Sequence, residues 1–174
     1  MKKSKKIAFC SVLSALSVIL VLGGNLFQFA SQAAPAVAGL IMMVILIETG
    51  VKWAFAAYFV SAALTFVLGI NEAGIIFTFF FGYYPIIKVF LENIRIRFFE
   101  YAAKFALFNA AMIIGYGILI SVFSLAALGF GKMIFVWITL AIGNLFFILY
   151  DICISKMAAL YIQKYRKYIK KLLK

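Results

Sequence analysis

The stretch Ile7–Phe27, IAFCSVLSALSVILVLGGNLF, contains no charged residue and follows the basic start MKKSKK. A helix that crosses the hydrocarbon core of a bilayer needs about 20 predominantly apolar residues, so this stretch predicts a membrane-spanning helix. The rest of the chain has the same character, because 67% of the 174 residues are hydrophobic and only 13% are charged. Soluble domains contain about 25% charged residues. The sequence therefore predicts an all-α, polytopic membrane protein.

Polar breaks divide the chain into six candidate spans, which together form one transmembrane domain over residues 1–155. We expect the spans at residues 7–27, 35–47, 53–70, 74–91, 105–128 and 133–155. The second span is short for a bilayer. Pro35 is expected in the first turn of its helix, where the missing N–H costs nothing. Six spans and their turns leave no length for a separate soluble domain.

The distribution of lysine and arginine predicts the orientation of the bundle. Cytoplasmic ends and short loops of membrane proteins are enriched in these residues. With the N-terminus inside, Lys132 is the only one of the 17 Lys and Arg residues that falls on the outer side. Both termini are therefore expected in the cytoplasm. The net charge of +12 needs no nucleic acid to explain it, and no DNA-binding or RNA-binding pattern accompanies the charge.

The N-terminal segment leaves one alternative open. A cleavable signal peptide also has a basic start and an apolar run, and small residues follow here at Ala30, Ser31, Ala33 and Ala34. The apolar run is longer than the core of a usual signal peptide, and its removal would leave an odd number of spans. We therefore expect the segment to be retained as the first span.

Residues 156–174 form a basic amphipathic tail that we expect on the cytoplasmic side. Basic residues occupy one arc of the predicted helix, and the other arc carries Ala158, Tyr161, Ile162, Tyr165, Ile169 and Leu172. Such a helix can lie in the headgroup layer and bind anionic lipid. A solvated basic end of the last span would have the same pattern.

The residues available for chemistry exclude several kinds of enzyme. The chain has no histidine, so a His-based metal site, proton relay or catalytic triad is excluded. Divalent cations need clustered carboxylates, whereas the five acids lie in separate segments: Glu48, Glu72, Glu92, Glu100 and Asp151. No phosphate-binding GxxxxGK[ST] loop is present. We expect no enzymatic activity, no metal and no other cofactor.

The stretch Phe80–Lys88, FFGYYPIIK, predicts a bend in the fourth span. Pro85 cannot donate a hydrogen bond to the carbonyl four residues before it, and Gly82 leaves room for a change of direction. Bent or broken helices near the membrane midplane are typical of solute sites in transporters. Tyr83 and Tyr84 are expected either to offer their hydroxyls to the freed carbonyl or to a solute, or to pack without contacting one.

Charged residues at membrane depth allow two interpretations. Lys88 either faces a solute or extends to the inner headgroups, and we favour the second. Glu48 and Asp151 lie near the inner surface, where we expect them to pair with Lys52 or Lys88 as structural contacts.

The last two spans each carry polar residues on one helical face. Trp137, Asn144 and Asp151 share a face of the span at residues 133–155, and Asn109 and Tyr116 share a face of the span before it. These faces are expected to point into the bundle. Their side chains either contact a solute or join helices by hydrogen bonds.

The first span carries small residues on one side of its inner half. Ser11 and Ala15 form a small-xxx-small pair, and Ala8 lies on the same side. Small residues allow another helix to approach closely. With six spans, a basic start and both ends inside, this layout resembles the substrate-binding S components of bacterial energy-coupling factor (ECF) vitamin transporters. Those proteins carry an Ala-x-x-x-Ala pair in the first helix, and here Ser11 takes the place of the first alanine.

The resemblance implies a location, partners and a place for the solute. It implies a multi-pass protein of the bacterial cytoplasmic membrane, with Ala8, Ser11 and Ala15 against a transmembrane T component. It also implies that two separate ATPase subunits supply the energy and that the solute binds in the outer half. No vitamin-specific motif is present, so the resemblance assigns no substrate residue.

Two functions from different classes remain open. The first is the substrate-binding subunit of an uptake transporter for a small molecule, a vitamin or similar micronutrient. Its pocket candidates are Asn71, Glu72, Tyr83, Tyr84, Tyr116, Trp137 and Asn144. Asn71 fits equally well as the cap of the fourth helix. The second function is a non-transporting bacterial membrane scaffold, whose small-residue faces and basic tail recruit partner proteins.

Overall fold

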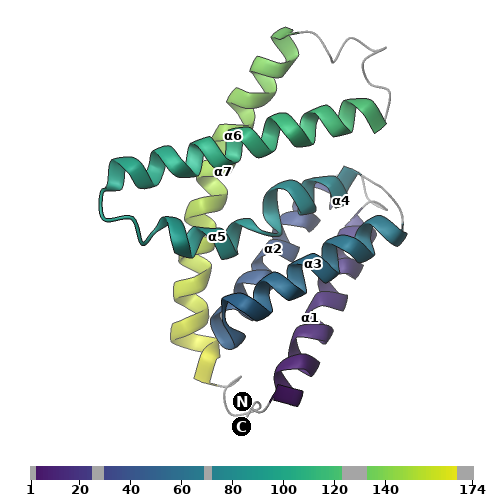
Figure 1. The fold of residues 1–174 in the computed structure, drawn as a ribbon, viewed down its shortest axis with the longest axis vertical. Coiled ribbons are helices and arrows are strands. Elements are labelled where there is room, and N and C mark those ends of the chain that lie inside the picture. Colours follow the sequence, from purple (N-terminus) through teal and green to yellow (C-terminus); the bar gives the residue numbers. More distant parts are fainter. Residues whose placement is uncertain (1–2, 25–29, 69–71, 123–132, 168–174) are drawn as a thin grey trace.

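The computed structural model of the protein describes residues 3–24, 30–68, 72–122 and 133–167. Within these ranges the secondary structure is helical and contains no strand (Figure 1). The α-helices and the π-helical turns η1 and η3 follow in the order α1 (Lys3–Gly24), α2 (Ala30–Thr49), α3 (Val51–Leu68), α4 (Glu72–Ile76), η1 (Phe77–Phe81), α5 (Tyr84–Leu91), α6 (Arg97–Val122), α7 (Met133–Leu160) and η3 (Tyr161–Tyr165).

The described helices have the lengths and compositions of membrane spans. Five segments are long and apolar enough to cross a bilayer: α1, α3, the combined segment Glu72–Leu91, α6 and α7 with η3. Helix α2 contributes a shorter apolar segment, Ala33–Thr49. In lipid a helix satisfies its own backbone hydrogen bonds, which is why apolar composition and helical structure coincide here. The all-α bundle predicted from the sequence is confirmed.

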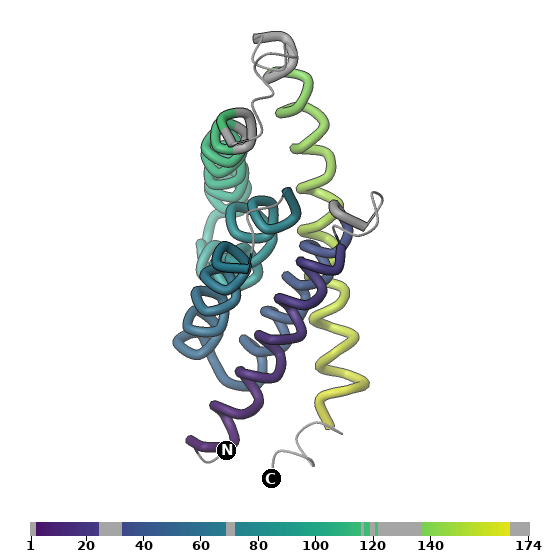
Figure 2. The backbone as a smooth tube through the Cα atoms, turned by 90° about the vertical axis from the view of Figure 1, so that its right-hand side faces the viewer, coloured from purple at the N-terminus to yellow at the C-terminus, as the bar shows by residue number. Residues whose placement is uncertain are grey.

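Two groups of buried side chains hold the bundle together. The first joins α1, α2, α3 and η1 and includes Val21, Met42, Ala54 and Phe77. The second joins α2, α5 and α7 and is made of Met43, Tyr84, Phe147, Tyr150 and Ile154. Helices α1 to α5 are packed closely, whereas α6 crosses α7 at a wide angle on one side of the molecule (Figures 1 and 2).

The described chain begins and ends at the same end of the molecule. The first turn of α1 and the last turn of η3 are both at the lower end of the molecule in the two views (Figures 1 and 2). An even number of spans places the two ends on one side of a membrane. The arrangement therefore agrees with the predicted six spans.

A single glycine makes the turn between α2 and α3. Gly50 has a positive φ of 93°, a conformation that glycine adopts without steric cost. Its N–H donates to the Leu46 carbonyl at 3.0 Å and so caps the end of α2. This turn lets α3 start at Val51, two residues before the predicted start of the third span.

Three predicted boundaries differ from the helix ends by five residues or more. Helix α2 begins at Ala30, so Pro35 lies inside the helix rather than in its first turn. Helix α6 begins at Arg97 instead of residue 105, because Glu100 and Lys104 pair within the helix and keep a charged segment helical. Helix α7 continues through η3 instead of ending at residue 155. The predicted end of the fifth span, residue 128, lies outside the described residues.

Candidate functional site

The fourth span is interrupted at the position that the sequence predicts. Helix α4 passes into the π turn η1, and α5 begins only at Tyr84, with Pro85 in its first turn. The N–H of Gly82 donates to the Phe77 carbonyl, five residues earlier, at 2.7 Å. Such π turns are often found at functional sites. The predicted bend is confirmed.

Tyrosines from other helices satisfy two carbonyls of this break. The hydroxyl of Tyr58 in α3 donates to the Thr78 carbonyl at 2.8 Å, and that of Tyr150 in α7 donates to the Phe81 carbonyl at 3.3 Å. The suggestion that Tyr83 or Tyr84 would bond the freed carbonyl is therefore wrong. Tyr150 does so, from 69 residues further along the chain, and no local spacing in the sequence indicates such a contact.

Tyr84 and Lys88 point from α5 to Asp151 of α7. The Tyr84 hydroxyl donates to the Asp151 carboxylate at 2.6 Å. The Lys88 ammonium pairs with the same carboxylate and also donates to the Asp151 carbonyl at 2.9 Å. Only 5% of the Lys88 side chain is exposed, so the favoured extension of Lys88 to the headgroups is wrong. The alternative pairing of Lys88 with Asp151 is confirmed.

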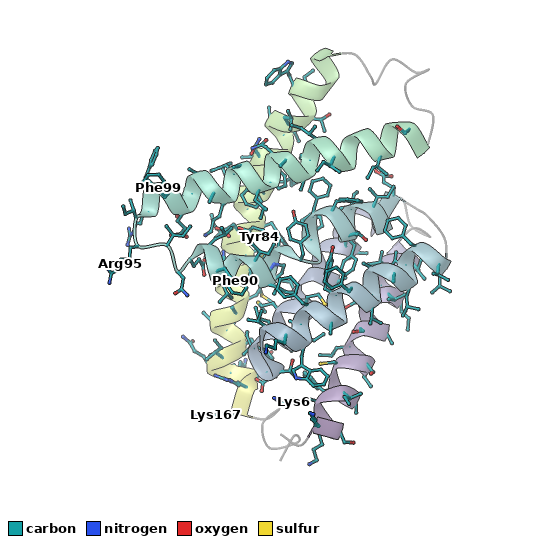
Figure 3. All side chains as sticks on the ribbon, in the orientation of Figure 1. Lys6, Tyr84, Phe90, Arg95, Phe99 and Lys167 are labelled. Atoms are coloured by element: carbon teal, nitrogen blue, oxygen red, sulfur yellow. The ribbon has the colours of Figure 1, made fainter. Side chains whose placement is uncertain are left out.

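A second buried lysine extends this pair into a cluster. Lys104 of α6 lies 2.7 Å from a Glu100 oxygen, 3.4 Å from a Glu92 oxygen and 3.5 Å from an Asp151 oxygen. Its side chain is 3% exposed. We call these residues, with Lys88 and Tyr84, the inner charge cluster. It joins α5 and α6 to α7, at the ends of α5 and α6 that the lysine and arginine distribution predicts to face the cytoplasm. Tyr84, one of its members, is labelled in Figure 3.

Most of the contacts in the inner charge cluster are not predicted from the sequence. Lys88 and Glu92, and likewise Glu100 and Lys104, are four residues apart and therefore neighbours on a helix. This spacing is the signal that could have found them. Nothing in the sequence indicates that both pairs meet at Asp151.

Asn144 joins two helices. Its amide group donates to the side-chain oxygen of Asn109 at 2.9 Å, and Asn109 donates back at 3.1 Å. Each amide also donates to the carbonyl four residues earlier in its own helix. Each amide nitrogen therefore donates both of its hydrogen bonds to protein oxygens. The interpretation that these two residues join helices by hydrogen bonds is confirmed.

The remaining pocket candidates do not meet in one place. Trp137 is 64% exposed, so the prediction that it points into the bundle is wrong. Tyr83 is half-buried and packs edge-on against Tyr58 of α3, with ring centroids 6.2 Å apart, whereas the Tyr84 hydroxyl contacts α7. Glu72 lies half-buried in the first turn of α4. Asn71 and the Tyr116 side chain lie outside the described residues.

One face of α1 is exposed in the part of the bundle that the structure describes. Ala8, Ser11 and Ala15 are all exposed. The other face is buried, where Ser14 donates to the Ala57 carbonyl at 3.5 Å and Ser61 donates to the Ser14 carbonyl at 3.4 Å. The small residues predicted to contact a partner helix are thus not used for packing within the described bundle.

The first part of the basic tail is docked on α2. Glu48 accepts a hydrogen bond from the Tyr161 hydroxyl at 3.3 Å and lies 3.4 Å from Arg166 Nε. Its side chain is only 3% exposed. The expected pairing of Glu48 with Lys52 or Lys88 is wrong. Of the predicted apolar arc, Tyr161 is buried, while Ile162 and Tyr165 are exposed.

Among the described residues, no group of three or more His, Cys, Asp or Glu side chains could hold a metal ion. Comparison with known proteins found no matching family model, no matching curated protein and no matching solved structure. The function must therefore be inferred from the fold and from the contacts of individual side chains.

Proposed function

We propose that this protein is the substrate-binding subunit of a small-molecule uptake transporter in the bacterial cytoplasmic membrane. The observation that carries the proposal is the interruption of the fourth span by η1 between α4 and α5. An interrupted helix inside a membrane places backbone polar groups and flanking side chains at a depth where a solute can bind. Like the ECF S components that the layout resembles, this subunit would not hydrolyse ATP itself.

We place the proposed solute site at the interruption and on its outer side. Tyr83 is half-buried beside it, and Glu72 begins the outer helix α4. Asn71 and Tyr116 remain candidates from their positions in the sequence. We leave Tyr84, Asn144 and Trp137 out of the site, because the first two bond to other helices and the third faces away from the bundle.

The inner charge cluster supports entry of the solute from the outer side. It ties α5, α6 and α7 together on the side that the lysine distribution assigns to the cytoplasm. Breaking a buried ion pair costs about 3 to 5 kcal/mol, so these ends would stay closed unless a partner opened them. Partners suited to that role are the T component and two ATPase subunits.

The exposed small face of α1 provides a surface for such a partner. Ala8, Ser11 and Ala15 carry small side chains and are uncovered by the described helices. In membranes, small residues let helix backbones approach closely and pack tightly. We therefore assign the contact with the T component to this face.

A scaffold that only recruits partners is the second candidate, and one observation favours it. Asn109 and Asn144 satisfy each other, as do Tyr84 and Asp151. Paired in this way, these polar groups need no solute to stabilise them. A scaffold would use the same α1 face and the basic tail.

A binding experiment separates the two candidates. The full chain is purified in detergent, and its melting temperature is measured with a panel of vitamins and other small micronutrients. A transporter subunit is stabilised by its solute, whereas a scaffold is not. Tyr83→Phe should raise the ligand concentration needed for the same stabilisation by about fivefold or more, since removing one partner of a polar contact costs about 1 to 3 kcal/mol. Tyr101→Phe, at an exposed tyrosine of α6, is the matched control and should change nothing.

The partner assignment has its own test. Affinity purification from the native membrane should recover ATPase subunits and a second membrane protein with the wild-type chain. Ser11→Leu should lose them, because a bulky side chain blocks close helix approach. Val12→Leu, at the next exposed position, should retain them. Recovery of neither kind of subunit, together with no stabilising solute, would favour the scaffold.

A further inference from the structure

The turn that joins α5 to α6 projects from the side of the molecule (Figures 1 and 3). We call residues 92–99 the α5–α6 elbow. Its backbone is held by hydrogen bonds from Asn93 N–H to the Phe90 carbonyl at 3.3 Å and from Ile94 N–H to the Leu91 carbonyl at 3.1 Å. The N–H of Glu100 donates to the Ile96 carbonyl at 3.1 Å and starts α6. The elbow is therefore an ordered surface feature.

The elbow separates its positive charges from its negative charges. Glu92 and Glu100 turn towards Lys104, 3.4 and 2.7 Å away. Arg95 and Arg97 are exposed, and neither forms an ion pair with any residue in the part of the chain that the structure describes. Figure 3 shows Arg95 pointing away from the protein. The outer surface of the elbow thus carries two uncompensated guanidinium groups.

Large apolar side chains lie beside these arginines. Ile96, Phe98 and Phe99 are 57%, 77% and 59% exposed, and the two phenylalanine rings contact each other edge-on at 5.9 Å between centroids. Phe99 is also part of a longer exposed face of α6, which continues at i+3, i+7, i+11 and i+14 through Ala102, Ala106, Ala110 and Ile113. In a membrane-spanning helix such an exposed apolar face contacts lipid chains.

We propose that the α5–α6 elbow is a binding site for an anionic phospholipid of the inner leaflet. A guanidinium group binds a phosphate oxygen pair through two parallel N–H bonds. The aromatic rings, continuous with the lipid-facing side of α6, accept the first part of the acyl chains. An acidic protein partner would match the arginines but not this continuity with the lipid-facing surface. The lipid is therefore the occupant, at a place distinct from the basic tail.

Lipid retention by the full-length chain tests this site. The delipidated protein in detergent is titrated with phosphatidylglycerol or with phosphatidylcholine of the same acyl chains, and bound lipid is counted by native mass spectrometry. Phosphatidylglycerol should bind more tightly. Arg95→Gln combined with Arg97→Gln should weaken its binding about tenfold or more, given the contribution of each basic residue near anionic lipid. Lys3→Gln with Lys5→Gln removes the same charge from exposed positions of α1 and should leave this binding in place.

Two further variants keep the test decisive. Arg95→Lys with Arg97→Lys retains the charge but not the bidentate geometry, and should weaken binding by a smaller factor. This variant also serves as the test if the glutamine variant does not fold. Phe98→Ser with Phe99→Ser should weaken binding of long-chain lipid but not of a short-chain analogue. The lysine variant tests the contact with the headgroup, and the serine variant tests the contact with the acyl chains of the same lipid.

Four results would overturn the proposal. Equal loss of phosphatidylglycerol binding in the Arg95/Arg97 glutamine variant and in the Lys3/Lys5 control would mean that positive charge attracts the lipid without a defined site. Equal affinity for the two lipids would remove headgroup recognition, and competition by glycerol phosphate at the same concentration as lipid would assign the arginines to a free phosphate compound. Loss of a co-purified acidic protein in the glutamine variant, with lipid binding unchanged, would assign the elbow to a protein partner.

Discussion

Asp151 is the residue at which the contacts of the inner charge cluster meet. Its carboxylate contacts Lys88 of α5, Lys104 of α6 and the Tyr84 hydroxyl. Both lysine side chains are almost fully buried, so each requires a negative partner. Glu92 is partly exposed and can share its charge with water, whereas the Asp151 side chain is much less exposed.

We predict that Asp151→Asn lowers the free energy of unfolding by about 3 to 5 kcal/mol, the cost of leaving a buried charge without its partner. The loss is measured as a fall in melting temperature of the detergent-purified protein. Lys156→Gln, an exposed position on the same helix, is the control and should change the melting temperature little. An unchanged Asp151→Asn protein would mean that Glu92 and Glu100 suffice for both lysines.

Replacing both Lys88 and Asp151 shows whether stability is lost because their contact is missing or because one buried charge is left unpaired. Lys88→Met combined with Asp151→Leu should be less destabilised than Asp151→Asn alone, because it removes a desolvated ion instead of isolating one. Melting temperatures of the two single variants and the double variant measure this difference. A double variant worse than either single variant would contradict it, and would show that the pair is needed for more than neutralising charge.

For single residues, the sequence predicts which side chains need a polar partner better than it predicts where those side chains point. It identifies Lys88 and Asp151 as candidates for pairing, because charged groups at membrane depth must find partners. Trp137 and Asn144 share a helical face in the sequence, yet one is exposed and the other bonds to α6. A helical repeat fixes which residues share a face. It does not fix how deeply each part of a long helix is packed, and Trp137, near the start of α7, is more exposed than Asn144.

The interrupted fourth span is the element that most constrains its neighbours. Gly39 of α2 lies against it, and a Cβ at that position would stand 2.5 Å from the Phe81 carbonyl oxygen and would also collide with the Tyr150 hydroxyl. Among the residues that the structure describes, no atom outside its own helix lies within 4 Å of a Cβ built at Gly23 in α1. The two glycines therefore differ in what surrounds them, although both are helical.

Gly39→Ala should destabilise the protein by about 1 to 3 kcal/mol, the usual cost of overpacking a core. Gly23→Ala should be neutral or stabilising by up to about 1 kcal/mol, because alanine is the better helix former. Melting temperatures in one detergent allow the comparison. If both variants melted together above the wild type, α2 would not pack against the break as described.

The amide pair between α6 and α7 is a second contact between elements. Asn109→Ala and Asn144→Ala each remove both interhelical hydrogen bonds, so the double variant should lose little more than either single variant. Interhelical hydrogen bonds in membranes are worth about 0.6 kcal/mol on average and about 2 at most. A double-mutant cycle on melting free energies measures this coupling, and strictly additive losses would contradict the direct contact.

For the helices, the sequence predicts the apolar spans but places several of their ends incorrectly. Lipid forces each span to close its own backbone hydrogen bonds, so apolar length is a reliable signal. Charge is a less reliable signal of a helix end. The charges in residues 97–104 predict a break, but the Glu100–Lys104 pair lies four residues apart within α6, where such a pair supports a helix.

In the protein as a whole, polar and charged contacts join helices that are far apart in the sequence. The inner charge cluster and the Glu48 contacts with Tyr161 and Arg166 join α2, α5, α6 and α7. The sequence could not predict this arrangement, because the partners of Glu48 lie 113 and 118 residues further on. The charge distribution alone, in contrast, predicts that the two ends of the chain lie on the same side of the membrane.

Orientation is the global property that the proposed function needs most, and cysteine labelling can measure it. Cys10 and Cys153 are first replaced by alanine. Lys52→Cys, near the turn between α2 and α3 and exposed, should react with a membrane-impermeant maleimide only after the cells are permeabilised. Lys132→Cys should react in intact cells, because it is the one basic residue assigned to the outer side. The reverse pattern would place the charge cluster and the α5–α6 elbow at the outer surface, and both the solute path and the inner-leaflet lipid site would then be excluded.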